Sequence, residues 1–393
     1  MHKDMASKQQ KKELSGNKGE WSEIYVFLRL LDTGMLNVAD DELNAIPNEF
    51  YRILEIIRKE TLTSNNYIRE NNSISIYIRN DETGEEESFT YPINVFAEKA
   101  EHLLQLIRQT KGRSFQLPPI ASFLKELRVS SIKDVGHNRD ITIKIEDFHT
   151  GMPQTLGFSI KSFLGSDSTL FNAGPGTNFI YEAVLPEGAT INCEEFNKRT
   201  YPISGRLAAR LKSLVEDYNA TIKFRGVQSM CFAQNLEAID GHMPYLLAQL
   251  LLISATYGKT SLKKCTELLT KTNPLEFNTL THGNIYEYKV KRFLQDCAQG
   301  MTPETPWLGI YDATGGQIIV KEDGDIVCYH IYELNRFRDF LFNSTKFERA
   351  STSEDGNNPG HPRPDASKNF NYGWLYEEDG RFFIKINLQV RSK

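Results

Sequence analysis

The chain has 393 residues and a formal net charge of -5 at pH 7. A chain of this length can form two or three packed units, each with its own core. Its hydrophobic share of 40% is typical of a water-soluble protein. The acidic balance argues against a protein that coats nucleic acid without specificity. It leaves room for a DNA enzyme with a local basic lining, because catalytic acids lower the total charge.

The five cysteines are widely spaced and no two form a Cys-x-x-Cys pair, which predicts reduced thiols in a cytoplasmic protein rather than a zinc site. Residues 1–15 are rich in lysine, and no apolar signal-peptide segment follows them. We therefore expect a disordered basic tail. The most apolar run, residues 243–257, is too short to cross a bilayer, so no membrane contact is expected.

Apolar residues recur at helical spacing from Glu20 onward, which predicts a helix that ends at Gly34. Glu20 and Glu23 lie one turn apart near its start. Acidic residues there can simply complement the helix dipole, and the residues alone favour that interpretation. Further helices are expected at 42–60, 96–109, 192–216, 236–257, 260–271, 284–298 and 335–343, and strands at 73–79, 88–95, 220–224, 308–313, 317–323, 325–332, 372–376 and 382–390.

Residues 139–163 predict a β-hairpin, because two runs with strand patterning flank a turn at 149–153. Folding about the centre of that turn places Asp140 opposite Lys161, where facing Cβ atoms are about 5 Å apart. A carboxylate and a lysine at the open end of a sheet can bind a metal ion and orient a water molecule. These are the groups that a metal-dependent phosphodiesterase uses.

Asp140 followed by Ser159-Ile160-Lys161 resembles the PD-(D/E)XK nuclease signature, in which an aspartate precedes an acidic-x-Lys triplet. Here Ser159 replaces the second acid. Three longer stretches, residues 16–31, 158–182 and 315–348, resemble HpaII-type restriction endonucleases, and the resemblance runs over most of the chain. It implies an α/β fold with a PD-(D/E)XK mixed-sheet core flanked by helices and a β-rich C-terminal portion.

The resemblance implies a type II restriction endonuclease that hydrolyses double-stranded DNA at a short palindromic site, CCGG by precedent, with Mg²⁺. Asp140 and a helix-borne glutamate would hold the metal, with the Ile160 carbonyl as a further ligand, while Lys161 positions or activates the attacking water. Gly19 and Glu23 reproduce a Gly-x-x-x-Glu setting that such nucleases use. Glu23 is therefore the first choice for the missing acid, followed by Glu20, with Asp167 and Glu182 in reserve.

Two segments are candidates for DNA contact. Residues 165–178 are rich in glycine and small polar side chains, and are either an ordinary loop or a DNA-facing one. Residues 192–216 carry the densest basic run in the middle of the chain, either as solvated helix charge or as a backbone-positioning face. The candidate residues are Asn172, Thr177 and Asn178 in the first segment and Lys198, Arg199 and Arg206 in the second.

We expect four parts: the tail at 1–15, helices and a hairpin contributing to the core at 16–135, the catalytic core with a helical segment at 136–300, and a β-rich portion at 301–393. The last part, with a loop at 351–369, is expected to help recognise the target sequence. A cognate DNA methyltransferase as genetic partner and a homodimer are further expectations. Two other functions stay open: a DNA-binding protein whose nuclease core has decayed, or a repair or RNA nuclease of the same fold.

Overall fold

The computed structural model describes residues 14–135, 139–165, 168–171, 174–199, 205–258, 260–311, 313–348 and 372–392. The chain divides into two compact units. Unit 1 contains residues 1–166 and 312–336, and unit 2 contains residues 167–311 and 337–393. The boundaries expected near 135 and 300 do not coincide with this division, because the segment 301–393 contributes to both units.

Unit 1 is built on a nine-stranded mixed sheet with the order β2-β14-β13-β9-β8-β3-β4-β5-β6. Two pairings, β13 with β9 and β14 with β2, are parallel, and the others are antiparallel. The strands are β2 (Met35–Ala39), β3 (Ala45–Lys59), β4 (Thr63–Arg69), β5 (Ser73–Asn80), β6 (Glu86–Pro92), β8 (Ile141–Glu146), β9 (Pro153–Ser162), β13 (Gly316–Val320) and β14 (Ile326–His330).

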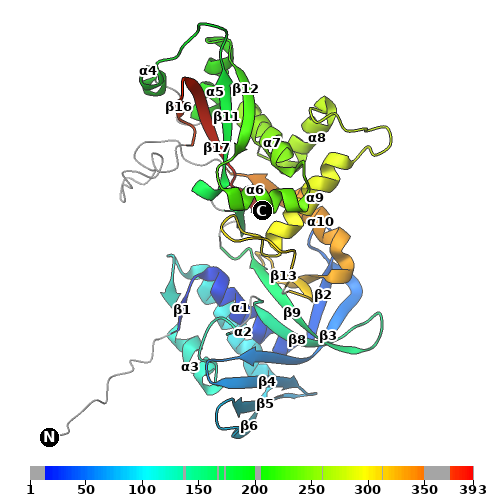
Figure 1. The fold of residues 1–393 in the computed structure, drawn as a ribbon. Helices are drawn as coiled ribbons and strands as arrows, with labels where there is room; N and C mark the ends of the chain where they lie inside the picture. Colours follow the sequence, from blue (N-terminus) through cyan, green and yellow to red (C-terminus); the bar gives the residue numbers. More distant parts are fainter. Residues whose placement is uncertain are drawn as a thin grey trace, which may run out of the picture. The chain divides into compact units, whose positions relative to one another are not determined.

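Helices α1 (Lys18–Thr33), α2 (Ile93–Gln109) and α3 (Pro118–Glu126) complete the core of unit 1 (Figure 1). A two-stranded pairing of β1 (Ser15–Gly16) with β7 (Phe115–Gln116) lies beside them. The expected first helix is confirmed. It starts at a capping box, in which the Asn17 side chain accepts from the Glu20 amide at 3.0 Å, and ends at Gly34 with φ of 69°.

The helix expected at 42–60 is wrong, because β3 occupies 45–59. Asn48 has φ of 65°, which a helix cannot accommodate, and the chain then extends between β8 and β4. Pairing on both sides overrides the helical preference of the Glu, Leu and Arg residues in this run. Successive side chains of the strand point to opposite faces, so Tyr51 and Ile53 are buried and Arg52 is exposed.

Unit 2 contains a four-stranded sheet, β12-β11-β17-β16, and a three-stranded sheet, β10-β18-β15. The strands are β10 (Ser168–Phe171), β11 (Asn178–Val184), β12 (Thr221–Val227), β15 (Thr345–Phe347), β16 (Leu375–Glu378), β17 (Arg381–Asn387) and β18 (Val390–Ser392). The helices are α4 (Cys193–Lys198), α5 (Arg206–Glu216), α6 (Met230–Ile239), α7 (Met243–Tyr257), α8 (Leu262–Thr272), α9 (Ile285–Ala298) and α10 (Leu334–Ser344), of which α10 crosses the unit boundary.

Several expectations for this unit need correction. The helical stretch at 192–216 is two helices, α4 and α5, and the one at 236–257 is also two, because Asp240 ends α6 and accepts from the His242 amide. No strand forms over the described residues 307–311. The loop at 351–369 lies outside the described residues. The α/β class is confirmed, and none of the described helices is both long and apolar enough to cross a membrane.

Candidate active site

Asp140 lies directly before β8, at the end of the β8–β9 hairpin opposite its turn. Its backbone N–H donates to the Phe158 carbonyl at 3.0 Å, and its Oδ2 accepts from the Ile160 amide at 2.6 Å. The last ladder pair is Ile141 with Phe158, so continuing the register puts Asp140 opposite Ser159. The side chain is thereby fixed to the backbone of the neighbouring strand.

The predicted pairing of Asp140 with Lys161 is therefore wrong by two residues. Glu146 pairs with Pro153, so the turn is centred one residue earlier than expected. Asp147 stabilises the turn, since its Oδ1 accepts from the His149 amide at 2.7 Å and its carbonyl accepts from the Gly151 amide at 2.6 Å. Since an antiparallel register depends on the sum of paired residue numbers, moving the centre by one residue moves each pairing by two.

Lys161 is nevertheless a neighbour of Asp140. Side chains two residues apart on a strand share a face, so Lys161 and Ser159 point to one side of β9. Ser162 points to the other side and donates to Ser22 Oγ on α1 at 2.7 Å, because the Ser22 hydroxyl proton is already used on the Lys18 carbonyl. Burial raises the pKa of Asp140 and outweighs the Ile160 amide and the Lys161 charge, which lower it.

Glu23 projects from α1 with one carboxylate oxygen buried and without a hydrogen-bond partner among the described residues. Burial raises the pKa of Glu23 to about 8, and the negative charge of Asp140 is the next cause. Lys133 and Arg58 act in the opposite direction. Glu23 and Asp140 are thus close enough to repel each other, and Glu23 has one buried oxygen without a hydrogen-bond partner among the described residues.

Glu20 differs from Glu23 because both of its oxygens are engaged. Oε2 accepts from the Asn17 amide at 2.8 Å in the capping box, and Oε1 lies 3.3 Å from Lys133 Nζ. The interpretation of Glu20 as a helix-start residue therefore has direct structural support. Glu23 remains the better candidate for a metal ligand.

Lys133 is a site neighbour that sequence reasoning missed. It contacts Glu20, and its charge lowers the pKa values of both Glu23 and Asp140. In the described part of its loop, residues 130–135, the residues on either side, Ile132 and Asp134, are buried, whereas Lys133 is exposed. The loop thus presents one cation to the carboxylates.

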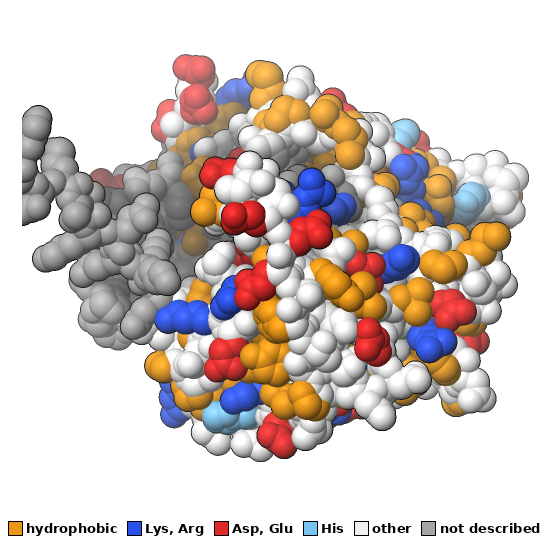
Figure 2. All heavy atoms as spheres, turned by 90° about the horizontal axis from the view of Figure 1, so that it is seen from below, with side chains coloured by type: hydrophobic (Ala, Val, Ile, Leu, Met, Phe, Trp, Pro, Cys, Tyr) orange, Lys and Arg blue, Asp and Glu red, His pale blue; other side chains and the backbone are white. Residues whose placement is uncertain are grey.

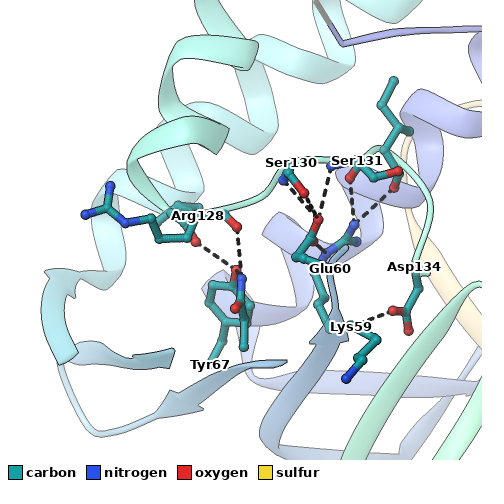
Figure 3. Close-up of polar contacts among 11 residues, drawn as sticks. Lys59, Glu60, Tyr67, Arg128, Ser130, Ser131 and Asp134 are labelled. Atoms are coloured by element: carbon teal, nitrogen blue, oxygen red, sulfur yellow. Dashed lines mark hydrogen bonds and ion pairs between the residues drawn. The ribbon is translucent and has the colours of Figure 1, made fainter. Parts of the chain in front are cut away.

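Buried charges hold this loop in place (Figure 3). Glu60 accepts from the amides of Ser130 and Ser131 at 2.9 and 3.1 Å, while Arg58 pairs with Glu60 at 3.2 Å and donates to the Ser131 carbonyl at 2.9 Å. Asp134 accepts from the Lys59 amide at 2.7 Å. Residues two apart on a strand share a face, so the pattern Arg58-x-Glu60 could have indicated that these two side chains lie together. The predicted helix over 42–60 hid this signal.

The residues present fit a divalent metal ion. No group of three or more His, Cys, Asp or Glu residues placed to hold a metal occurs in the described part of the chain. Two carboxylates, Asp140 and Glu23, do come together, one with an unsatisfied oxygen. Hard cations such as Mg²⁺ prefer oxygen ligands and commonly take one or two carboxylates, with substrate phosphate and water completing the shell.

The DNA-contact residues predicted in the glycine-rich loop lie inside unit 2 where they are described. The side chains of Thr177 and Asn178 are buried, and the Asn387 side-chain NH₂ donates to Thr177 Oγ1 at 3.0 Å and to Asn178 Oδ1 at 2.8 Å. They hold η1 (Pro175–Thr177) and β11 against β17. Asn172 and Asp167 lie outside the described residues.

The basic residues of α4 and its end make local contacts. Lys198 pairs with Glu194 one turn earlier at 2.5 Å. Arg199 donates to Tyr218 Oη at 2.6 Å and pairs with Asp217 at 3.4 Å. Arg206 begins α5. These contacts support the solvated or structural interpretation for Lys198 and Arg199.

Glu182, a reserve candidate for the missing acid, lies on β11 in unit 2. It accepts from both Arg225 and Arg381, and the Arg381 bond is the largest cause of a lowered pKa for this carboxylate. The structure therefore gives Glu182 a partner set of its own, separate from Asp140, which belongs to unit 1.

Comparison with known proteins identifies the family of the chain. The sequence model of the HpaII restriction endonuclease family matches residues 17–392. The chain belongs to this family. The type II restriction enzyme HpaII of Haemophilus parainfluenzae is 39% identical over 379 residues, which cover 96% of this chain and 98% of that protein. No solved structure matches. The resemblance seen in the sequence is confirmed, and with it the predicted class, a type II restriction endonuclease.

Proposed function

We propose that the protein cuts double-stranded DNA at a short palindromic site, CCGG, with Mg²⁺, and that Asp140, Glu23 and Lys161 carry the chemistry. The single observation behind this proposal is that Asp140 interacts electrostatically both with Lys161 and with Glu23, which has one buried and unsatisfied oxygen. The fold proposed for unit 1 is the PD-(D/E)XK arrangement. In it, Glu23 would supply the acid that Ser159 cannot provide.

Asp140 and Glu23 would hold the metal, with the Ile160 carbonyl as a further ligand. The Ile160 amide, bonded to Asp140 Oδ2, fixes one carboxylate oxygen and leaves Oδ1 for other contacts. A bound Mg²⁺ would lower the pKa of a water molecule and offset the charge that develops on the phosphate. Lys161, on the same strand face as Ser159, would orient the attacking water or a phosphate oxygen by donating a proton in a hydrogen bond.

A cleavage assay on plasmid DNA with Mg²⁺ tests the proposal. Wild-type protein should give discrete bands, and Asp140→Asn or Lys161→Ala should lower the rate at least about 10²-fold while DNA binding persists, because both act on the transition state. Lys144→Ala is the matched control. Lys144 lies on the same hairpin but makes only a half-exposed pair with Glu55 at 3.8 Å, and such pairs contribute little.

The same assay separates the alternatives. A smear would indicate a nonspecific nuclease, and uncut DNA with a gel shift would indicate a DNA-binding protein with a decayed core. Substantial cutting by both site variants would refute the residue assignment. A methyltransferase that modifies the same sequence, and a homodimer that matches a palindrome, belong to this proposal. Protection of methylated DNA and the mass of the protein in solution test them.

A further inference from the structure

One face of the four-stranded sheet in unit 2 gathers four cations. The pairing register of β11 with β12 and β17 shows that these side chains lie on the same face of the sheet. Glu182 is opposite Lys223 on β12 and opposite Phe383 on β17, and residues two apart on a strand share a face, which adds Arg381 and Lys385. The opposite face packs on helices, since Tyr181 donates to the Ala248 carbonyl of α7 at 2.7 Å.

The fourth cation, Arg225, is placed by a β-bulge. Tyr181 pairs with Phe224 and Ile180 with Gly226, so Arg225 is the extra residue on β12. Bulges re-aim a side chain and are common at functional edges. Here the bulge brings the Arg225 guanidinium onto the Glu182 carboxylate.

Glu182 holds two arginines at once. Arg381 donates through Nε to Oε1 at 2.8 Å and through Nη2 to Oε2 at 2.5 Å, and Arg225 donates to the same Oε2. The carboxylate is 9% exposed, whereas the Arg225 and Arg381 side chains are 42% and 51% exposed. The acid lies beneath the cations and orients them, and a guanidinium has five N–H groups, so each arginine keeps donors for another partner.

Two aromatic rings support the other half of the face. Tyr376 and Phe383 stack with centroids 5.7 Å apart. The Arg381 guanidinium lies 5.2 Å from the Phe383 ring, and Lys385 Nζ lies 5.1 Å from the Tyr376 ring. Such contacts restrict long side chains and reduce the entropy lost on binding a ligand.

The charge of this face differs from that of the rest of the chain. Its four cations, Lys223, Arg225, Arg381 and Lys385, outnumber its two acids, Glu182 and Glu378, which gives a net +2, whereas the chain carries -5. By contrast, the face seen in Figure 2 intermixes basic, acidic and hydrophobic side chains without a continuous basic patch.

We propose that this basic face, defined by Lys223, Arg225, Arg381 and Lys385, binds the phosphate backbone of the DNA substrate. The cations lie on β12 and β17, which flank β11, and the Arg225 and Arg381 guanidinium groups converge on Glu182 between these strands. Lys223 and Lys385 lie on the same face, so the charges form one cluster that can donate to phosphate oxygens. The inference rests on the proposed function and names the surface that positions the substrate.

The test measures DNA binding in EDTA, where no cutting occurs, by fluorescence anisotropy of a labelled duplex at several salt concentrations. The double variant Lys223→Ala/Lys385→Met removes two charges while Met keeps the apolar stem over Tyr376. Each lost phosphate contact should reduce the slope of log K against log salt by about 1, so a reduction of about 2 is expected, equally for duplexes with and without CCGG. The matched control, Lys264→Ala/Lys271→Ala, removes two exposed helix lysines of the same unit and should leave the slope unchanged.

The outcomes are separable. If the wild type neither binds nor cuts DNA, the proposed function fails. If the wild type binds and the double variant keeps its salt slope, or the control variant loses as much slope, the basic face is not the binding surface. Thermal unfolding of each variant should match that of the wild type. A further variant, Arg381→Ala, leaves Glu182 paired to Arg225 and should reduce the slope of log K against log salt by about 1.

Discussion

At the scale of single residues, Glu23 departs furthest from ordinary behaviour among the acids proposed for the site. Its neighbour Glu20 has both oxygens occupied, whereas Glu23 Oε2 is buried and unsatisfied. Leaving a buried polar atom without a partner costs about 1–3 kcal/mol. Such a free-energy cost in the ligand-free protein is expected at a site where a bound ligand later contacts the unsatisfied oxygen.

A cleavage series tests this difference. Glu23→Gln should eliminate Mg²⁺-dependent cutting, because an amide binds a hard cation poorly, and Glu20→Gln should weaken cutting less, since Glu20 acts through the helix start and Lys133. Ser159→Ala should be tolerated better than either. Rates are measured on one plasmid under identical conditions. If both glutamine variants cut normally, the carboxylates of this helix are structural.

The raised pKa of Glu23 predicts a pH dependence of stability in the metal-free protein. The folded state binds this proton more tightly than the unfolded state, so the contribution of Glu23 to the free energy of unfolding should fall as pH rises from about 4.5 to about 8. Buried His330, with its pKa lowered to about 4, acts in the opposite direction, so the Glu23 contribution is obtained as the difference between wild type and Glu23→Gln. The total effect is about 2–4 kcal/mol, smaller than the full shift implies because solvent screens part of it. Denaturant unfolding in EDTA measures it.

Glu23→Gln should remove this decline, and Ser159→Ala, which changes no titratable group, should keep it. Addition of Mg²⁺ should restore stability at high pH, since the ion replaces the proton and binds only the folded site. A stability difference between wild type and Glu23→Gln that stays level between pH 5 and 8 would show that Glu23 ionises without penalty.

At the scale of elements, strand β3 and the loop at 130–135 act together. Glu60 and Arg58 are almost fully buried, and the loop reaches them with four backbone groups, the amides of Ser130 and Ser131 and the carbonyls of Ser131 and Ile132. A buried ion pair adds little net stability compared with apolar residues, but it fixes geometry. The geometry that it fixes is the position of Lys133 beside the site carboxylates.

Glu60→Ala should destabilise the protein by about 3–5 kcal/mol, because it leaves the Arg58 charge buried and unpaired. Lys133→Met is the paired control, since an exposed lysine should change stability by no more than about 0.5 kcal/mol. It should nevertheless lower the cleavage rate. Urea unfolding measures the first effect and plasmid cleavage the second. Equal stability of the two variants would contradict the role given to the buried pair.

At the scale of the whole molecule, the C-terminal portion cannot be separated as an appendage. Strand β13 is hydrogen-bonded to β9 and β14, and β14 pairs with β2, so residues 301–393 complete the sheet of unit 1. The same portion supplies β17, which lies between β11 and β16 in unit 2. Each unit is therefore made from segments distant in sequence.

Removal of residues 305–393 should abolish cooperative folding rather than only target selection. The deletion exposes the edge of β9 in unit 1 and of β11 in unit 2, and unpaired edges of this kind promote aggregation. Circular dichroism melting and size-exclusion chromatography of residues 1–304 measure this. A monomer with a sharp melting transition would show that the C-terminal strands are dispensable for folding.

The sequence by itself determined the local elements and the family. Apolar spacing and Gly34 located the first helix and its end, strand patterning at 317–323 and 325–332 located the two strands of the β13–β14 hairpin, and three long stretches identified the HpaII restriction endonuclease family. These features depend on neighbours in the chain, so a single sequence contains them. Asp140, Glu23 and Lys161 were also named from the sequence as candidates, and their roles stay predictions.

Only the tertiary structure decided burial and the meeting of distant segments. The strand character of 45–59 follows from partners on both sides, and the burial of Thr177 and Asn178 follows from Asn387, more than 200 residues away. The basic face of unit 2 unites β12 and β17 through β11. Each depends on contacts across long sequence separations, which local patterns do not encode.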